Sequence, residues 1–118
     1  MTDYSTLPLI RSTLLAQFPH VRVAQSTRQG AAPGAPFGFN LGYGLGDDDT
    51  RVTTAIAAVA ARLDLDPEDL AFMYQVHGAS IREISEPGVY DETDALITRQ
   101  AGIGLTVRTA DCVPVMLY

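Results

Sequence analysis

The chain has 118 residues, of which 47% are apolar, and its formal net charge is −6. This length suits one domain, and the apolar content is normal for a globular fold and argues against disorder. The eight basic residues form no stripe along the chain, so the composition excludes a general affinity for nucleic acids or anionic membranes.

The start of the chain and its cysteine content both favour the cytoplasm. Residues 1–5 carry an acid and no basic segment, a pattern that does not fit a signal peptide. No apolar run approaches the roughly 20 residues that span a bilayer. The only cysteine, Cys112, cannot form a disulfide within the chain, which fits a reducing compartment. We therefore expect a soluble, cytoplasmic protein.

The first half of the chain predicts a helix, a strand and a long loop. Residues 7–18 carry apolar side chains at helical spacing, which predicts a short amphipathic helix that Pro19 ends. Residues 21–27 alternate in the way that a strand with one solvated face does. Residues 29–46 hold six glycines and two prolines, which predicts a long loop of the kind that is usually functional or mobile.

The clearest element is a helix that follows three acids. Its apolar residues repeat with the helical period, and alanines favour helix between them; they are Val52, Ile56, Val59 and Leu63. Asp47, Asp48 and Asp49 are expected to cap this helix and to complement its dipole. Pro67 then starts a single turn over residues 67–70.

The second half predicts strands, and helix and strand mix without a regular βαβ alternation. We therefore predict an α+β fold with mixed β-sheets flanked by helices. The run 104–118 is the most apolar and β-branched of the chain, and we expect it to be a buried strand. It ends without a turn or a cap, so we expect the domain to be truncated at its C-terminal end. The other expected strands are residues 71–77, 80–84 and 94–98, with a loop over 85–92.

Two residues are the best candidates for chemistry. His77 closes a predicted strand before Gly78, so in a regular strand it shares a face with Gln75. It is either a half-buried residue bonded to the backbone, or a ligand or general base at a strand end. Cys112 is either a small buried hydrophobe or a functional thiol at a loop-to-strand junction before Pro114. An imidazole and a thiolate suit zinc or copper, and equally suit a nucleophile and its base.

Five blocks of sequence occur in an order that points to one family. They are Ser-Thr-Arg-Gln-Gly at 26–30, Asn-Leu-Gly at 40–42 with Gly-Asp-Asp at 46–48, Gln-Val-His-Gly at 75–78, Asp-Ala-Leu-Ile-Thr at 94–98 and Thr-Ala-Asp-Cys-Val-Pro-Val at 109–115. In these blocks the chain resembles the laccase-domain family, whose members are also called multicopper polyphenol oxidoreductase-like proteins or purine nucleoside phosphorylases. The resemblance runs from about residue 20 to the end. It implies that residues 1–118 are the N-terminal part of a single laccase-like domain.

The resemblance implies a metal site, usually with zinc, built from two histidines and a cysteine. The histidine of the Gln-Val-His-Gly block and the cysteine of the Thr-Ala-Asp-Cys block correspond to His77 and Cys112, which would be both catalytic and metal-binding. The second histidine belongs to a His-Ala-Gly-Trp-Arg-Gly block that is absent from this sequence. The implied reaction is phosphorolysis of adenosine, inosine or guanosine, with adenosine deamination as a companion activity.

Four further residues are candidates for contacts around such a site. Arg28 would meet a phosphate, and Asn40 and Gln75 would hydrogen-bond the nucleoside. Asp111 would either contact the substrate or accept the free N–H of a ligating imidazole. The expected partners are a purine nucleoside and phosphate, with neither nucleic acid nor membrane.

Three other functions stay open at this point. A copper-dependent polyphenol oxidase needs many histidines, and the chain has only His20 and His77. A hydrolase acting through Cys112 and His77, or a non-enzymatic remnant of the fold, would also fit. With two of three zinc ligands, the isolated chain is expected to bind zinc poorly and to turn nucleosides over slowly. An exposed C-terminal strand edge is expected to pair with a second copy or with a missing C-terminal half.

Overall fold

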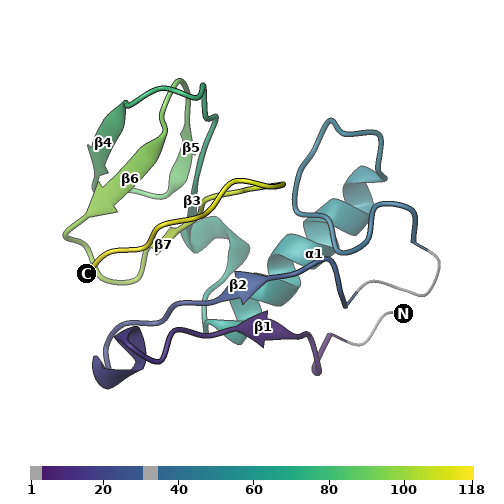
Figure 1. Cartoon of the computed structure of the whole chain (residues 1–118), viewed down its shortest axis with the longest axis horizontal. Helices are drawn as coiled ribbons and strands as arrows, with labels where there is room; N and C mark the ends of the chain where they lie inside the picture. Colours follow the sequence, from purple (N-terminus) through teal and green to yellow (C-terminus); the bar gives the residue numbers. More distant parts are fainter. Residues whose placement is uncertain (1–3, 31–34) are drawn as a thin grey trace. The chain divides into compact units, whose positions relative to one another are not determined.

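The structure is a computed structural model that describes residues 4–30 and 35–118. The chain divides into two compact units, residues 1–63 with Tyr118 and residues 64–117. Across the described residues, one α-helix, two short 3-10 helices and seven strands in three sheets follow one another (Figure 1). The predicted mixture of helix and several sheets is therefore confirmed.

The first unit opens with a short hairpin-like pair of strands. β1 (Leu9–Ile10) pairs antiparallel with β2 (Gln25–Ser26), the only part of the predicted strand 21–27 that joins a ladder. The predicted helix over residues 7–18 is wrong, because this segment holds β1 and the 3-10 helix η1 (Leu15–Gln17). A helix of that length is marginal in water, since isolated helices below about 12–15 residues gain too little to offset nucleation. The apolar spacing is misleading too, since Leu14 is 69% exposed.

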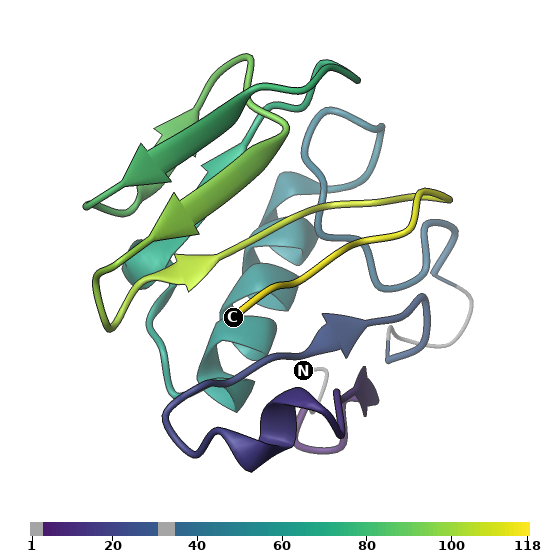
Figure 2. The same ribbon diagram turned by 60° about the vertical axis from the view of Figure 1, so that its left-hand side comes forward.

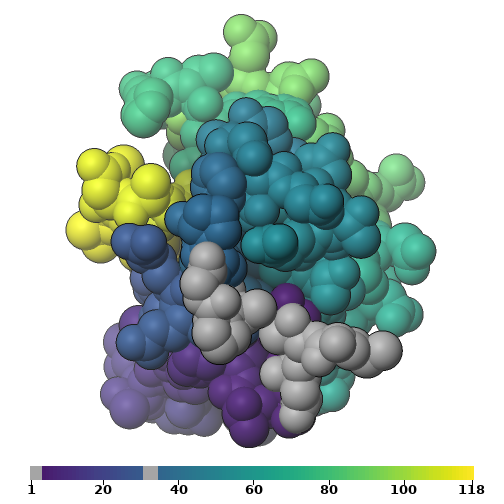
Figure 3. Space-filling view, turned by 90° about the vertical axis from the view of Figure 1, so that its right-hand side faces the viewer, coloured from purple at the N-terminus to yellow at the C-terminus, as the bar shows by residue number. Residues whose placement is uncertain are grey.

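The helix α1 (Asp49–Arg62) is the main element of the first unit and confirms the prediction. Its N-cap is Asp48, whose carboxylate accepts a hydrogen bond from the Arg51 backbone N–H at 3.1 Å. The loop that precedes it, residues 35–46, has no helix or strand in the described part of the chain. This loop lies beside α1 (Figure 3). The Tyr43 hydroxyl of the loop hydrogen-bonds the Thr53 hydroxyl of α1 at 2.8 Å. Residues 31–34 of the predicted loop lie outside the described residues.

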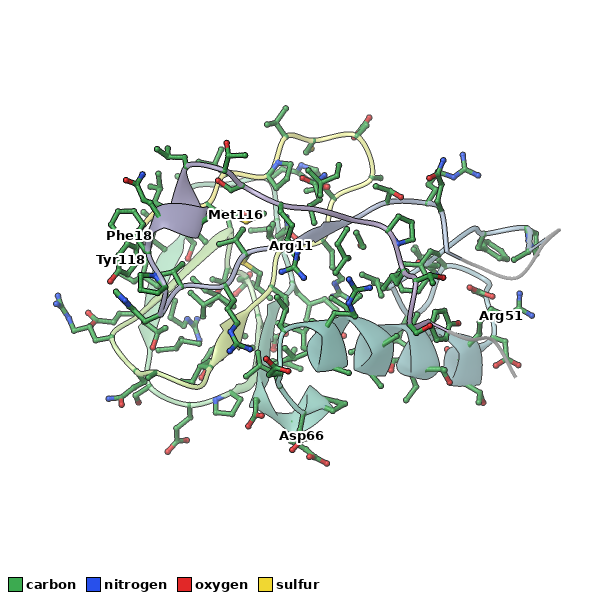
Figure 4. The ribbon with its side chains drawn as sticks, turned by 90° about the horizontal axis from the view of Figure 1, so that it is seen from below. Arg11, Phe18, Arg51, Asp66, Met116 and Tyr118 are labelled. Carbon is green, nitrogen blue, oxygen red and sulfur yellow. The ribbon has the colours of Figure 1, made fainter. Side chains whose placement is uncertain are left out.

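The core of the first unit joins the helix to the N-terminal segment and the loop. Its centre is Leu7, Phe39 and Ala55, all less than 9% exposed. The Arg62 guanidinium donates to the Leu7 carbonyl at 2.8 Å, which ties the end of α1 to the chain before β1. Tyr118 also belongs to this unit, where its ring lies 4.9 Å from that of Phe18 (Figure 4).

The second unit contains two parallel sheets. β3 (Leu70–Met73) lies between β5 (Gly88–Tyr90) and β7 (Gly104–Leu105), and the 3-10 helix η2 (Pro67–Asp69) leads into it as predicted. β4 (Ile81–Ile84) pairs with β6 (Ala95–Thr98), and these two strands lie side by side in Figure 2. The predicted loop over 85–92 is wrong in part, because β5 lies inside it and finds a partner in β3.

The apolar run 104–118 is not the buried strand that its composition predicts. Only its first two residues pair with β3 in the described structure, and Val113 and Leu117 are 84% and 91% exposed. A β-branched sequence gains stability in a sheet only when a partner strand and a packing surface are present. β3 still holds Thr106, whose backbone N–H donates to the Ala71 carbonyl at 3.0 Å, but residues 107–117 join no described strand.

Within residues 4–30 and 35–118, no helix combines the length and the apolar character needed to cross a membrane.

Candidate active site

His77 lies in a loop, not at the end of a strand. β3 ends at Met73, and residues 74–80 form an irregular connection before β4. The predicted strand 71–77 is therefore too long, and the expectation that Gln75 and His77 share one face of a regular strand is wrong. His77 has a φ of 56°, in the left-handed region that residues other than glycine seldom adopt. The histidine is exposed, so the interpretation of a half-buried residue satisfied by the backbone is also wrong.

The carboxylate of Asp94, just before β6, lies against the backbone of the His77 loop. Its Oδ1 accepts the Val76 N–H at 3.0 Å and its Oδ2 accepts the Ser80 N–H at 3.4 Å. Partial burial raises the pKa of Asp94, but hydrogen bonds from the N–H groups of Val76, Gly78, Ser80 and His77 outweigh it and lower the pKa overall. Asp94 is therefore an ionised acceptor around which the loop is folded.

Cys112 is an exposed, free thiol on the segment after β7. The interpretation of Cys112 as a small buried hydrophobe is therefore wrong. Its Sγ lies 3.9 Å from Oδ1 of the neighbouring Asp111, a weak S–H donor contact at most. Residues 110–112 form a bend and no described strand follows them, so the thiol lies in irregular chain and not at a loop-to-strand junction.

The described residues do not form a complete metal site. Nowhere in residues 4–30 and 35–118 do three or more histidine, cysteine, aspartate or glutamate side chains come together as a metal-binding group. His77 and Cys112 have the donor types that zinc and copper prefer, but a catalytic zinc needs three protein ligands. The donor types of His77 and Cys112 fit zinc or copper, but the number of donors that the described residues bring together does not.

Two of the predicted substrate contacts lie in the first unit. Arg28 is exposed, and its backbone carbonyl accepts the Phe39 N–H at 2.9 Å. The Asn40 amide serves the loop itself: its Nδ2 donates to the Gly42 carbonyl at 3.0 Å and to the Asp47 carboxylate at 3.3 Å, while its Oδ1 accepts the Gly42 N–H at 2.9 Å. Asn40 thus fixes the chain that leads into α1.

The other two predicted contacts, Gln75 and Asp111, lie in the second unit and are exposed. Gln75 shares the irregular loop with His77, and Asp111 adjoins Cys112. The two candidate ligands, His77 and Cys112, therefore each have one candidate substrate contact close by in the sequence. The assignment of all six residues to a site stays a prediction.

Sequence reasoning misses Asp94 and Arg108 as parts of this region. The sequence pattern places Asp94 only as the first residue of a strand, although it belongs to one of the five blocks. Arg108, in the segment after β7, lies over the rings of Phe72 and Tyr74, with its guanidinium carbon 5.5 and 5.9 Å from their centroids. Asp94 could have been found as a polar residue inside a family block that has no role in the hydrophobic pattern. Arg108 could have been found as a charged residue inside the apolar run 104–118.

Residues 22–118 match the model of the family described as multi-copper polyphenol oxidoreductase laccase. This chain belongs to that family. The match covers every residue proposed for the site, so the resemblance inferred from the five blocks is confirmed.

The relatives within this laccase family are mostly named as nucleoside enzymes. The chain is 39% identical over 112 residues to a purine nucleoside phosphorylase of Deinococcus radiodurans, covering 94% of the chain and 42% of that protein. It is 38% identical over 100 residues to one of Mycobacterium tuberculosis, covering 82% of the chain and 40% of the relative. It is also 37% identical over 106 residues to adenosine deaminase RL5 from an unknown prokaryotic organism, covering 80% of the chain and 40% of that protein. The chain thus spans about 40% of the length of these curated relatives.

Proposed function

We propose that this chain carries part of the active site of a purine nucleoside phosphorylase that uses zinc. The observation that carries the proposal is the 39% identity, over 94% of the chain, to a protein named for that activity. Two exposed side chains, His77 and Cys112, support it, because both are accessible and both are donor types that zinc binds. The described residues bring no third ligand together with them, so the proposal requires a ligand from elsewhere.

The proposed reaction is the phosphorolysis of adenosine, inosine or guanosine. A phosphate oxygen forms a bond to C1′ of the ribose, the bond from C1′ to the purine nitrogen breaks, and its electron pair leaves with the base, which takes up a proton. Arg28 would bind the phosphate, because a guanidinium forms paired, charge-assisted hydrogen bonds to its oxygens. Gln75 would hydrogen-bond the nucleoside. Asn40 would also hydrogen-bond the nucleoside, but its side-chain amide already donates to the Gly42 carbonyl and the Asp47 carboxylate.

Adenosine deamination is a second candidate, favoured by the relative named adenosine deaminase RL5. Here water adds to C6 of the purine and ammonia leaves, so phosphate is not consumed. The two reactions are therefore separated by their need for phosphate. Copper-dependent polyphenol oxidation is less well supported, because two histidines in the sequence cannot hold several copper ions.

The experiment incubates the 118-residue chain with inosine or adenosine and zinc, with and without inorganic phosphate, and measures free base, ribose 1-phosphate and inosine. We expect slow release of base, below about one turnover per second, that requires phosphate and is lost in His77→Ala. Base release that does not depend on phosphate would overturn phosphorolysis. A rate of about one per second or more would overturn the inference that the described ligand set is incomplete.

A Cys–His hydrolase is tested by alkylating Cys112 with iodoacetamide in the zinc-loaded chain. A metal-bound thiolate resists alkylation until the metal is chelated, whereas a free thiolate nucleophile reacts at once. We expect protection that a chelator removes. Equal reaction rates with and without the chelator would favour the hydrolase.

A further inference from the structure

The loop that carries His77 is fastened at both ends to the chain that enters β6. The Tyr74 carbonyl accepts the Thr93 N–H at 3.1 Å. At the other end, the Ser80 carbonyl accepts the N–H groups of Asp94 and Ala95 at 2.9 and 3.0 Å. These backbone bonds set where the loop begins and ends, but they leave residues 75–79 between them without a ladder.

The Asp94 carboxylate holds this loop in place through hydrogen bonds to its backbone. One oxygen accepts from Val76, directly before His77, and the other accepts from Ser80, three residues after it. Gly78 makes room for this carboxylate, because a Cβ at that position would lie 3.1 Å from Oδ2 of Asp94. The loop therefore wraps around one side chain, and His77 lies between the residues that touch it.

The backbone of His77 needs such support. A left-handed conformation is unfavourable for a residue with a Cβ, and it persists only where the surroundings enforce it. A carboxylate that accepts two backbone N–H groups is a strong constraint, since charge-assisted hydrogen bonds are the stronger kind. Because φ and the position of Cβ are linked, the same constraint fixes the direction in which the His77 side chain leaves the loop.

We infer that Asp94 is a positioning residue that holds the 76–80 loop around its carboxylate and so presents the imidazole of His77. The metal role of His77 in this statement rests on the proposed function. The geometric part stands on the loop alone. Asp94 acts through the backbone of the loop, whose Val76 and Ser80 N–H groups it binds.

The test compares Asp94→Asn with Asp91→Asn, which removes the same charge from a nearby exposed residue. Asn keeps one acceptor oxygen and replaces the other with an NH₂ group, so at least the bond from Val76 or the bond from Ser80 is lost. In the metal-free chain, amide exchange of Val76 and Ser80 and the HN–Hα coupling of His77 are measured by NMR. We expect exchange at least about tenfold faster and an averaged coupling in Asp94→Asn, with Asp91→Asn like the parent chain. Unchanged exchange and coupling in Asp94→Asn would overturn the inference.

Cobalt(II) titration of the same chains measures the affinity for Co²⁺ and the absorption band of the Cys112 thiolate. The band reports the ligand itself, which a loss of stability alone does not change. We expect Asp94→Asn to weaken Co²⁺ binding by about 10–100-fold, as loss of an outer partner of a ligand does, while the thiolate band from Cys112 survives at saturation. Gly78→Ala is the second variant. It keeps the charge but crowds Oδ2, so it should loosen the loop in the same direction even where Asp94→Asn does not fold.

The two hypotheses fail in different ways. If Asp94→Asn frees the loop while His77→Ala leaves Co²⁺ binding unchanged, the positioning role stands and the metal role of His77 falls. If His77→Ala abolishes Co²⁺ binding while Asp94→Asn and Gly78→Ala change neither loop nor affinity, the proposed function stands and the positioning role falls.

Discussion

At the scale of single residues, the structure places backbone strain at the residue chosen for chemistry. His77 is exposed and left-handed, and a left-handed backbone opposes what local preference would select. Strained residues persist where the surrounding structure supports them, and they cluster at functional sites. The strain therefore adds weight to a functional interpretation of His77 that its position in the sequence did not provide.

Replacing His77 by glycine or alanine separates strain from function. Both variants lack the imidazole, but only alanine keeps a Cβ in the left-handed conformation. The free energy of unfolding should therefore be about 1 kcal/mol higher for His77→Gly than for His77→Ala. Urea unfolding of the metal-free chains measures the difference. Equal stability of His77→Gly and His77→Ala would contradict a left-handed His77.

The depressed pKa of Asp94 predicts how the loop responds to acid. Since the folded pKa lies below the value of about 3.9 in an unfolded chain, the ionised carboxylate stabilises the fold fully above that value. This contribution is lost as the pH falls through the folded pKa. The stability difference between the metal-free parent chain and Asp94→Asn should therefore shrink below about pH 4. Unfolding curves at several pH values measure it, and a difference that does not change with pH would contradict the shift.

How far the site is predictable differs between residues. His77 and Cys112 follow from the Gln-Val-His-Gly and Thr-Ala-Asp-Cys blocks, because a family pattern marks residue types directly. Asp94 does not follow, since its carboxylate meets the Val76 backbone eighteen positions away through a loop with no hydrophobic period. Only the folded structure brings such a pair together.

At the scale of elements, the structure separates strong local signals from weak ones. α1 was predictable because capping, alanine content and apolar period agree in one segment. Residues 7–18 had the period alone, and pairing of β1 with β2 prevailed. The strand predicted over 104–118 failed because composition cannot tell whether a partner strand exists.

The N-cap of α1 gives a test at this scale. Asp48→Ala removes the acceptor for the Arg51 N–H and should destabilise the first unit by about 1 kcal/mol. Asp49→Ala is the matched control, because the Asp49 carboxylate lies in the first turn and contributes through the helix dipole, about 0.3–1 kcal/mol. Thermal or urea unfolding compares the two. A smaller loss for Asp48→Ala than for Asp49→Ala would contradict the cap.

At the scale of the whole molecule, the chain consists of two compact units and spans about 40% of its curated relatives. Its last residues expose apolar side chains, and exposed apolar groups that lie together mark interaction surfaces; among them are Val113, Val115, Leu117 and Tyr118. Association with a second copy of this chain or with a C-terminal half of the domain stays a prediction. So does the description of residues 1–118 as part of one domain.

Equilibrium titration with Co²⁺ tests most directly the central claim that His77 and Cys112 are metal ligands. The parent chain is compared with His77→Ala, Cys112→Ala and His20→Ala, which removes the other histidine of the sequence. We predict weak binding with a thiolate charge-transfer band that disappears in Cys112→Ala, an affinity at least about tenfold lower in His77→Ala, and no change in His20→Ala. Parent-like binding and spectra in both His77→Ala and Cys112→Ala would contradict the claim.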